Sequence, residues 1–510
     1  MSNFLEICPH EMGLKQIREF RYGEDCRVKL APEAISRINR GTEIILNKIK
    51  SGAVIYGVNT GVGPFGDRSI REDQILDLQE RLVLSNCAGV GSPFPPHIVR
   101  VAMLLKVCSL SSGQCGVSLS LVDTMVEAIN RGFIPVVPSQ GSVGASGDLA
   151  PLAHIAASLC GHGEAWFGGE RMASKEGLRL AGIDPVRLGA KEGAALLNGT
   201  EISTSLAIEG LFRAENALVM SVLTGLLTLE SAFGSVQASD PRIQEARGQT
   251  GQIRVAAAQK ALLGQSEMQK LTRPRIQDPY CLRCQPAVVG AALDTLEHVA
   301  KVLGCEVGAV TDNPIICLET EELLYGGNFH AQPIGLAADM TAMAMSEIGN
   351  ISERRTALLM DSKFSGLPDF LVSDAGLNSG LMLGQVTAAA LVSENKHLAT
   401  PVSLDSIPTG ANTEDYVSMA TGAGFRLLKM ADNLEYILGI ELLAASQGID
   451  FRRPAQTSLT LEAYWSALRA VVPVWEVDRM LAPDIQKASE IIHEGWVVEG
   501  ILKSLMPSLN

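Results

Sequence analysis

The sequence has little positive charge for its size. Its 510 residues include 42 Lys and Arg against 56 Asp and Glu, so the formal net charge is −14 and the sequence pI is about 5.2. A surface that binds nucleic acid needs the opposite sign. Nucleic acid is therefore not an expected partner.

Long apolar runs and secretory features are also missing. The first residues include Glu6 and Glu11, where a secretory signal has a basic start and an apolar stretch. The most apolar stretch, residues 217–229, contains Thr224 and Gly225 and is shorter than the roughly 20 residues of a membrane helix. Ten cysteines in 510 residues are too few for a disulfide scaffold. We therefore expect a cytoplasmic protein with reduced thiols and no membrane partner.

Internal repeats, low-complexity tracts and Gly/Ser linkers are absent, which favours one continuous body. Hydrophobic residues make up 46% and charged residues 19%, as is typical of a globular protein. Apolar residues recur at three- and four-residue spacing in several long segments, at 73–84, 99–110, 119–130, 202–233, 282–303, 334–359 and 416–445. The predicted fold is mostly α, a bundle of long helices.

Glycine and proline gather between these segments, where a helical scaffold exposes irregular backbone. We predict a loop-rich N-terminal part over residues 1–200, and a long central bundle with C-terminal helices over residues 201–510. Chemistry is expected in the clusters, which lie at 57–66, 89–96, 135–151, 278–286 and 406–411.

The first cluster contains a G-x-G-x-x-G pattern formed by Gly61, Gly63 and Gly66, after a run of β-forming residues at 53–58. A dinucleotide site needs this motif within alternating strands and helices. Here Pro64 lies inside the motif and helical segments follow it. The pattern alone does not indicate a nucleotide.

Two further patterns are also weak. Cys281 and Cys284 form a single C-x-x-C with no second pair and no nearby histidine, so no metal site is predicted. The hydrolase elbow G-x-S-x-G is nearly matched around Ser146, but the glycines stand two residues before it and one residue after it. A hydrolase is the weaker interpretation.

The strongest signal is the order of small residues in GSVGASGDLAP at 141–151. This segment resembles the prosthetic-group loop of the aromatic amino acid ammonia-lyase family. In that family an Ala-Ser-Gly triplet cyclises to 4-methylideneimidazol-5-one (MIO), and the matching residues are Ala145, Ser146 and Gly147. The amide nitrogen of Gly147 would attack the carbonyl of Ala145, and loss of water would leave a methylene group from Ser146. No external cofactor is then expected.

The resemblance covers nearly the whole chain in order. The other matching motifs are YGVNTG at 56–61, LVLS at 82–85, LNGT at 197–200, QDPYCLRC at 277–284, TDNP at 311–314, GGNFH at 326–330, LNSG at 377–380 and ED at 414–415. It implies the long-helix fold of the histidine and phenylalanine ammonia-lyases. It also implies a homotetramer in which loops of different subunits complete each active site.

The resemblance also implies roles for single residues. Tyr56 would be the base that removes the β-proton, which requires hydrogen-bond donors or positive charge near its phenol. Arg283 would bind the substrate carboxylate through its planar fork. The remaining roles are positioning of the substrate by Asn198 and Gln277, loop ordering and proton handling by Tyr280, and a wall near MIO formed by Phe329.

Substrate choice depends on fewer residues. Glu414 and Met382 resemble the histidine-specific members, and a carboxylate can pair with an imidazole. Those members usually have histidine where this chain has Asn86, phenylalanine at Val62 and glutamine at Thr413. Because Asn86 can donate and accept hydrogen bonds, a polar ring is still favoured over a phenyl group.

The leading predicted reaction converts L-histidine to trans-urocanate and ammonia. Within the same superfamily, the alternatives are a 2,3-aminomutase and a lyase for a modified histidine, tyrosine or phenylalanine. From another class, a non-catalytic helical assembly protein would leave residues 145–147 uncyclised.

Overall fold

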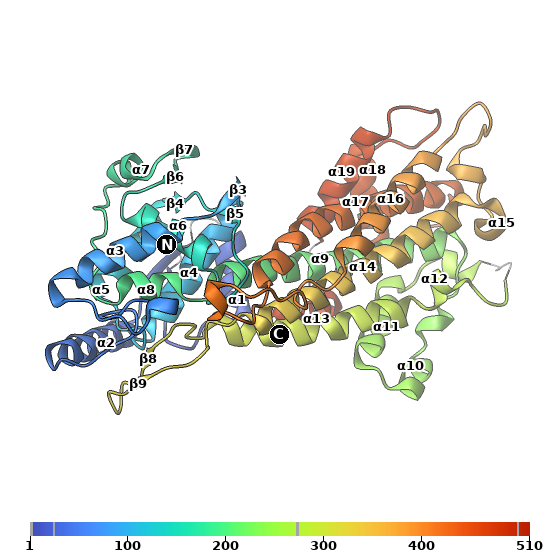
Figure 1. Ribbon diagram of the computed structural model, residues 1–510. Coiled ribbons are helices and arrows are strands. Elements are labelled where there is room, and N and C mark those ends of the chain that lie inside the picture. Colours follow the sequence, from blue (N-terminus) through green and yellow to red (C-terminus); the bar gives the residue numbers. More distant parts are fainter. Residues whose placement is uncertain (1–3, 24–25, 272–274, 497–498, 510) are drawn as a thin grey trace. The chain divides into compact units, whose positions relative to one another are not determined.

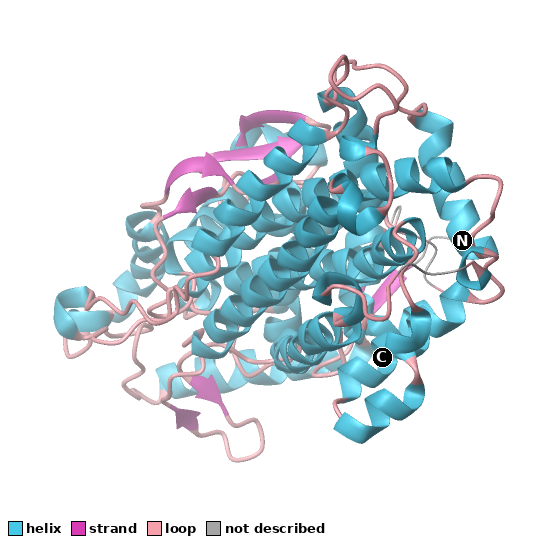
Figure 2. Cartoon of the chain, turned by 90° about the vertical axis from the view of Figure 1, so that its right-hand side faces the viewer, coloured by secondary structure: helices cyan, strands magenta, loops and turns pink. Residues whose placement is uncertain are grey.

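The computed structural model describes residues 4–23, 26–271, 275–496 and 499–509. Helices dominate these ranges, and the strands are short and lie in small separate sheets (Figure 1, Figure 2). The prediction of a mostly α fold with long helices is confirmed. Within the described ranges, no helix combines the length and apolar character needed to cross a membrane.

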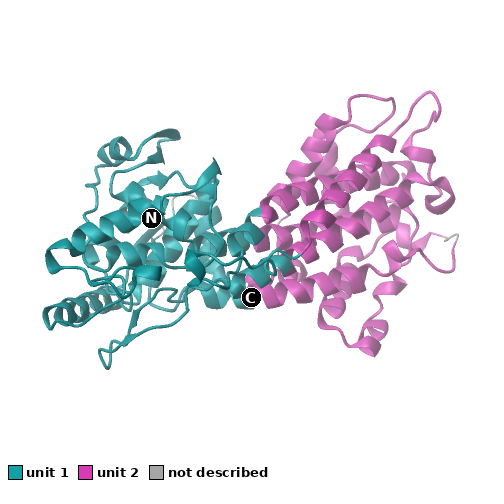
Figure 3. Ribbon diagram, in the orientation of Figure 1, with its two compact units in different colours: residues 1–209, 301–339, 401–425 teal, residues 210–300, 340–400, 426–510 magenta. Residues whose placement is uncertain are grey.

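The chain divides into two compact units, which Figure 3 colours separately. Unit 1 consists of residues 1–209, 301–339 and 401–425, and unit 2 consists of residues 210–300, 340–400 and 426–510. Each unit therefore combines segments that are far apart in the sequence.

Within the described residues, all the strands belong to unit 1. Its helices are α1 (Leu14–Tyr22), α2 (Pro32–Lys50), α3 (Ile75–Asn86), α4 (Pro96–Ser111), α5 (Leu119–Arg131), α6 (Leu149–Leu159), α7 (Ser174–Ala181) and α8 (Glu192–Leu197). Its strands are β1 (Phe4–Ile7), β2 (Arg27–Leu30), β3 (Val90–Pro93), β4 (Ile134–Pro135), β5 (Pro138–Gln140), β6 (Glu164–Phe167), β7 (Glu170–Ala173), β8 (Ile315–Ile316) and β9 (Leu323–Leu324).

The small sheets connect segments of unit 1 through main-chain hydrogen bonds. Strands β1 and β2 pair in parallel, with Phe4 opposite Arg27. The other pairings are antiparallel: β3 with β5, β4 with β6, β6 with β7, and β8 with β9. The β3–β5 pair joins the segment after α3 to the segment before residue 141.

Most of each of the longest helices belongs to unit 2. These helices are α9 (Glu201–Ser231), α13 (Gln285–Val307), α14 (Gln332–Met360) and α17 (Ala420–Arg452), and the division between the units falls inside all of them. The other helices of unit 2 are α10 (Pro241–Arg247), α11 (Thr250–Leu263), α12 (Tyr280–Arg283), α15 (Ser362–Ser365), α16 (Met382–Leu398), α18 (Leu459–Val471) and α19 (Ala482–Glu494).

Helix α9 shows why these rods form. Consecutive residues such as Leu218, Val219 and Met220 are fully buried, so the helix is enclosed all round and not only along one stripe. A helix that is apolar on every side must lie inside a bundle. The long apolar segment of the sequence at 202–233 therefore forms a helix that is buried on all sides.

The predicted helices at 99–110, 119–130 and 334–359 lie within α4, α5 and α14. Two other predicted starts were too early. The segment predicted from 416 becomes helical only at Ala420, because Met419 has a φ of 52°, which a right-handed helix cannot contain. The segment predicted from 282 begins within a short helix, Tyr280–Arg283, and continues as α13 from Gln285 after a break at Cys284. The segment predicted from 73 begins as a 3₁₀ turn, Glu72–Gln74, before α3.

The β-forming run at 53–58 is not a strand. The Asn59 side chain accepts a hydrogen bond from the Ile55 amide at 2.7 Å, and the Val58 amide donates to the Ile55 carbonyl at 3.1 Å. Ile55 and Val58 are buried in a cluster with Ile44 of α2. Local side-chain bonding therefore closes a turn and overrides the β propensity of these residues.

Candidate active site

Unit 1 contains a cavity of about 350 Å³ where six segments meet. The loop after residue 55, the C-terminal end of α3, the segment at 141–149, the end of α8, the segment around Asn313 and the loop at 409–414 all contribute to it. The lining residues are Tyr56, Val62, Gly63, Pro64, Phe65, Leu82, Asn86, Ser146, Leu149, Ala194, Leu197, Asn198, Asn313 and Glu414.

The glycine pattern at 61–66 holds the phenol of Tyr56. The Gly63 amide donates to the Tyr56 Oη at 2.6 Å, in the 3₁₀ turn Gly63–Phe65. A Cβ at Gly66 would lie 3.0 Å from the Tyr56 ring, so the ring packs directly on this backbone. Because the phenol oxygen accepts this bond, its own proton is free for another partner.

The Ala-Ser-Gly triplet lies in a backbone that requires its glycine. Gly147 has a φ of +75°, and a Cβ on it would lie 1.9 Å from the Gly199 carbonyl oxygen and 3.0 Å from the Phe329 carbonyl oxygen. No other residue fits between these main-chain groups. The contact also places the main chain of Phe329 beside the triplet.

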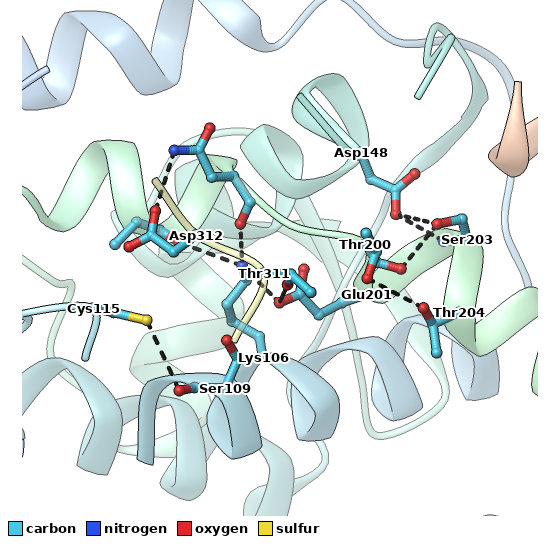
Figure 4. A network of polar contacts seen from close by, with 12 residues as sticks. Lys106, Ser109, Cys115, Asp148, Thr200, Glu201, Ser203, Thr204, Thr311 and Asp312 are labelled. Carbon is cyan, nitrogen blue, oxygen red and sulfur yellow. Dashed lines mark hydrogen bonds and ion pairs between the residues drawn. The ribbon is translucent and has the colours of Figure 1, made fainter. Parts of the chain in front are cut away.

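Asp148 anchors the C-terminal side of the triplet. Its carboxylate accepts from the Ser203 amide at 2.8 Å, the Ser203 hydroxyl at 3.0 Å and the Thr421 hydroxyl at 2.6 Å. Its amide donates to the Gly199 carbonyl at 2.7 Å. The Asp148 side chain is fully buried, and burial raises its pKa. Figure 4 shows Asp148 pointing at Ser203.

The backbone of the triplet fits the formation of MIO. Within the described residues, neither the Gly147 amide nor the Ala145 carbonyl takes part in a hydrogen bond. These are the two groups that cyclisation would join, whereas the neighbouring Val143 and Gly144 carbonyls are bound by Met419 and Ser418. The frame of the loop is thus fixed while the reacting atoms are left free.

Glu414 faces the triplet across the cavity. Its Oε1 accepts from the Ser146 hydroxyl at 3.2 Å, and its Oε2 accepts from the Thr409 hydroxyl at 2.7 Å. The loop that carries it includes Ala411 and Asn412 with φ of 53° and 68°. Left-handed backbone in non-glycine residues is costly and gathers at functional sites.

Asn86 and Asn198 supply amide groups to the cavity. Asn86 ends α3, and its Nδ2 donates to the Leu82 carbonyl at 2.8 Å. Asn198 follows α8, and its Nδ2 donates to the Asp312 carboxylate at 3.2 Å and the Asn313 carbonyl at 3.0 Å. Both asparagines are therefore held by their amide nitrogens.

Four of the site residues named from the sequence belong to unit 2 and do not line this cavity. Tyr280 is 71% exposed at the start of α12, and the Arg283 guanidinium lies 4.7 Å from the centre of its ring. Gln277 is exposed, and Met382 begins α16. Their roles remain predictions.

Sequence reasoning missed some of the cavity lining. Asn313 lies in the TDNP motif at 311–314, so its motif offered a signal, but no role was assigned to it. Phe65, Leu82 and Leu149 form an apolar wall and lie within the quoted motifs or clusters, but no role was assigned to them, because apolar residues near loops are common in any globular chain.

The structure also shows the surroundings of the C-x-x-C pair and of the G-x-G-x-x-G segment. Cys281 and Cys284 are partly buried free thiols, and burial raises the pKa of Cys281. In the described part of the chain, no group of three His, Cys, Asp or Glu side chains is placed to hold a metal ion. The G-x-G-x-x-G segment packs on Tyr56, as described above.

Comparison with known proteins identifies the family. Residues 12–470 match the aromatic amino acid lyase family. The chain belongs to this family. It is therefore a carbon–nitrogen lyase, as the resemblance implied, and the family is the MIO-type lyase family.

The relatives agree over the full length. A histidine ammonia-lyase from Desulfotalea psychrophila is 47% identical over 512 residues, covering 100% of both chains. The solved structure of histidine ammonia-lyase from Trypanosoma cruzi is 34% identical with a TM-score of 0.90, covering 100% of this chain and 95% of that one. The solved structure of the Pantoea agglomerans phenylalanine aminomutase is 31% identical with a TM-score of 0.92, covering 96% of this chain and 99% of that one. The predicted ammonia-lyase type of fold is thus confirmed.

Proposed function

We propose that this lyase eliminates ammonia from L-histidine to give trans-urocanate. The observation that carries the proposal is Glu414, whose carboxylate lies 3.2 Å from Ser146 in the cavity that also contains Tyr56. A carboxylate beside the reacting centre favours a substrate ring with an N–H donor over a phenyl ring. The 47% identical relative named histidine ammonia-lyase supports the same substrate.

Ala145, Ser146 and Gly147 would form MIO, held by Asp148 and by the contact with Gly199. When formed, this group supplies an electrophile that ordinary side chains lack and makes the substrate amine a better leaving group. Its formation is supported by the Gly147 amide and the Ala145 carbonyl, which take part in no hydrogen bond with the residues that the structure describes.

Tyr56 is proposed as the base for the β-proton. Its oxygen already accepts the Gly63 N–H at 2.6 Å, and this donor remains available to stabilise the negative charge of a phenolate. The rigid glycine turn fixes the direction of the phenol toward the cavity. A base must first be in the right geometry, and here the turn provides it.

We propose that Gln277, Tyr280, Arg283 and Met382 complete the site from other subunits of a homotetramer. Tyr280 is exposed, and the planar fork of Arg283 suits a substrate carboxylate. Large apolar side chains on α14 and α16 are also exposed, notably Met343 at 46% and Leu383 at 55%. Light scattering at micromolar concentration should give four times the mass of the chain, and a fully active monomer would contradict shared sites.

Incubation with a panel of amino acids, followed by mass analysis of the products, tests the reaction. The panel contains L-histidine, a modified histidine, L-tyrosine and L-phenylalanine. Urocanate and ammonia from L-histidine are expected. A β-amino acid of unchanged mass would instead indicate a 2,3-aminomutase, which the similarity to the phenylalanine aminomutase keeps as the second candidate.

The control for this experiment is Ser146→Ala, which should abolish turnover while the protein stays folded, because the methylene carbon comes from the serine. Intact mass should show a loss of two waters in the wild-type chain and none in the variant. Full activity of the variant would exclude MIO chemistry.

A further inference from the structure

Lys106 of α4 is a buried cation directly behind the candidate site. Its side chain is 3% exposed, and its Nζ lies 2.8 Å from the Glu201 carboxylate. Nζ also donates to the Asn198 carbonyl at 2.5 Å and the Ala195 carbonyl at 3.3 Å. An ammonium group has three donors, and three acceptor oxygens surround it. Burying this charge is tolerable only because all three are satisfied.

The acid partner of Lys106 connects it to the triplet. Glu201 accepts a second bond from the Thr311 hydroxyl at 3.3 Å, and its other oxygen is buried with no hydrogen-bond partner among the described residues. That oxygen packs on Gly199, where a Cβ would lie 2.2 Å from it. Burial raises the pKa of Glu201. Figure 4 shows Lys106, Thr311 and Glu201 together in this network.

A second buried ion pair holds the other end of Asn198. The Lys191 ammonium lies 2.5 Å from the Asp312 carboxylate, with both side chains nearly inaccessible to solvent. Asp312 in turn accepts from the Asn198 Nδ2 at 3.2 Å. One ion pair thus fixes the main chain of Asn198, and the other fixes its amide nitrogen.

We infer that Lys106 is a positioning residue for the elimination reaction, acting through Asn198. Because both N–H groups of the Asn198 amide are occupied by Asp312 and Asn313, its Oδ1 is the polar atom left for the cavity. A carbonyl oxygen accepts a hydrogen bond from a donor, such as the ammonium group of the substrate. The inference rests on the proposed function in that Asn198 contacts the substrate.

A double-mutant cycle separates positioning from simple support of the fold. Lys106→Met removes the donors and keeps the length of the side chain. With Asn198 present, it should lower kcat/KM about 100-fold per MIO, since a misplacement near 1 Å has such an effect. In the Asn198→Ala background the same change should lower kcat/KM by less than about 3-fold. Equal losses in the two backgrounds would overturn the inference.

The matched control is Glu306→Gln. Glu306 accepts from the Thr200 hydroxyl at 2.6 Å, so it supports the same turn without a bond to Asn198. Its kcat/KM should stay within about 2-fold of wild type in both backgrounds. If Lys106→Met does not fold, Lys106→Gln, which keeps a shorter neutral donor, enters the same cycle. Failure of both variants to fold would assign Lys106 to the fold alone and overturn the inference.

Crystal structures of the wild type and of Lys106→Met provide a readout that does not depend on turnover. The Asn198 side chain should shift or take a second rotamer in the variant. An unmoved Asn198 would overturn the inference. If the wild-type protein turns over no amino acid of the panel, the proposed function fails, and these structures alone decide the role of Lys106.

Discussion

Both units contain buried ion pairs, and the Arg355–Glu441 pair of unit 2 differs from the Lys106–Glu201 pair of unit 1 in what surrounds it. In unit 2, Arg355 and Glu441 are both fully buried, 2.5 Å apart. Glu441 also accepts from the Thr228 hydroxyl at 2.8 Å and the Ser352 hydroxyl at 2.6 Å. Its partners come from the side chains of long helices. In unit 1, Lys106 instead directs two of its donors at main-chain carbonyls beside the cavity.

The difference shows how one type of interaction serves two purposes. A pair whose carboxylate is bound by side chains of neighbouring helices adds specificity to helix packing. A pair that binds the carbonyls at the C-terminal end of α8 fixes the chain where the helix ends, because the last carbonyls of a helix have no partner within the helix. Removing one partner from either pair leaves a buried charge and is costly. Only in unit 1 should the effect also reach substrate turnover.

Tyr56→Phe should give the largest effect, confined to catalysis. Loss of a positioned base lowers kcat by roughly 10²- to 10⁴-fold. The MIO absorbance and the thermal midpoint should stay at wild-type values, because the phenol makes its bond to Gly63 at the cavity edge. Steady-state kinetics with a MIO spectrum test this together. An unchanged rate would remove Tyr56 from the mechanism.

Glu441→Gln should show the opposite behaviour in unit 2. It leaves the Arg355 cation in the core without its counter-ion, which costs about 3–5 kcal/mol of folding free energy. The thermal midpoint should fall strongly, whereas kcat per folded, MIO-containing chain should remain near wild type. If kcat fell in proportion to stability, the difference drawn between the Arg355–Glu441 pair and the Lys106–Glu201 pair would be wrong.

The control for this prediction is Glu394→Gln, also in unit 2. Glu394 lies 3.9 Å from Lys429, and both side chains are about half exposed. A pair of this kind contributes at most about 1 kcal/mol. Its thermal midpoint should therefore change much less than that of Glu441→Gln.

The sequence predicted the rods of both units better than their ends. Helices such as α9 and α14 are long and buried, so their apolar spacing is unambiguous. The start of α17 depends on the backbone of one residue, Met419, and no periodic pattern encodes that. The turn at 53–58 depends on one side chain, Asn59.

The site was predictable only where residues stand within motifs. Tyr56, Ser146 and Glu414 come from motifs far apart in the sequence and line one cavity. The support of Asn198 was not predicted, because Lys106 stands in no motif and Asp312, although it lies in the TDNP motif, had no assigned role. Such contacts depend on the packing of α4 and of the 311–314 loop, which a single sequence does not specify.

Asn86 and Glu414 allow the substrate side of unit 1 to be tested with a smaller expected effect. Asn86→His should raise kcat/KM for L-histidine relative to the other amino acids, and Asn86→Leu should shift preference toward an apolar ring. Glu414→Gln should lower histidine turnover. Differences of about 10- to 200-fold are typical of such pocket changes. Unchanged relative kcat/KM across histidine, phenylalanine and tyrosine for all three variants would show that these residues do not select the ring.

His154 should give the smallest effect and tests a partly buried neutral group against the two charged pairs. Its Nε2 accepts the Gly89 N–H at 3.2 Å, and burial lowers the pKa of His154 below 6.5. Because the fold favours the neutral ring, the stability that His154 contributes is present above its unfolded pKa of 6.5 and is lost as the pH falls through the lower folded pKa. In His154→Gln this pH-dependent loss should be absent. The free energies of unfolding of the two proteins, measured with urea, should therefore differ by a constant amount from pH 7 to 8. Below pH 6.5 the wild type should lose up to about 1.4 kcal/mol per pH unit relative to the variant. A constant difference down to pH 5 would show that the ring keeps its hydrogen bond to Gly89 without a cost in protonation.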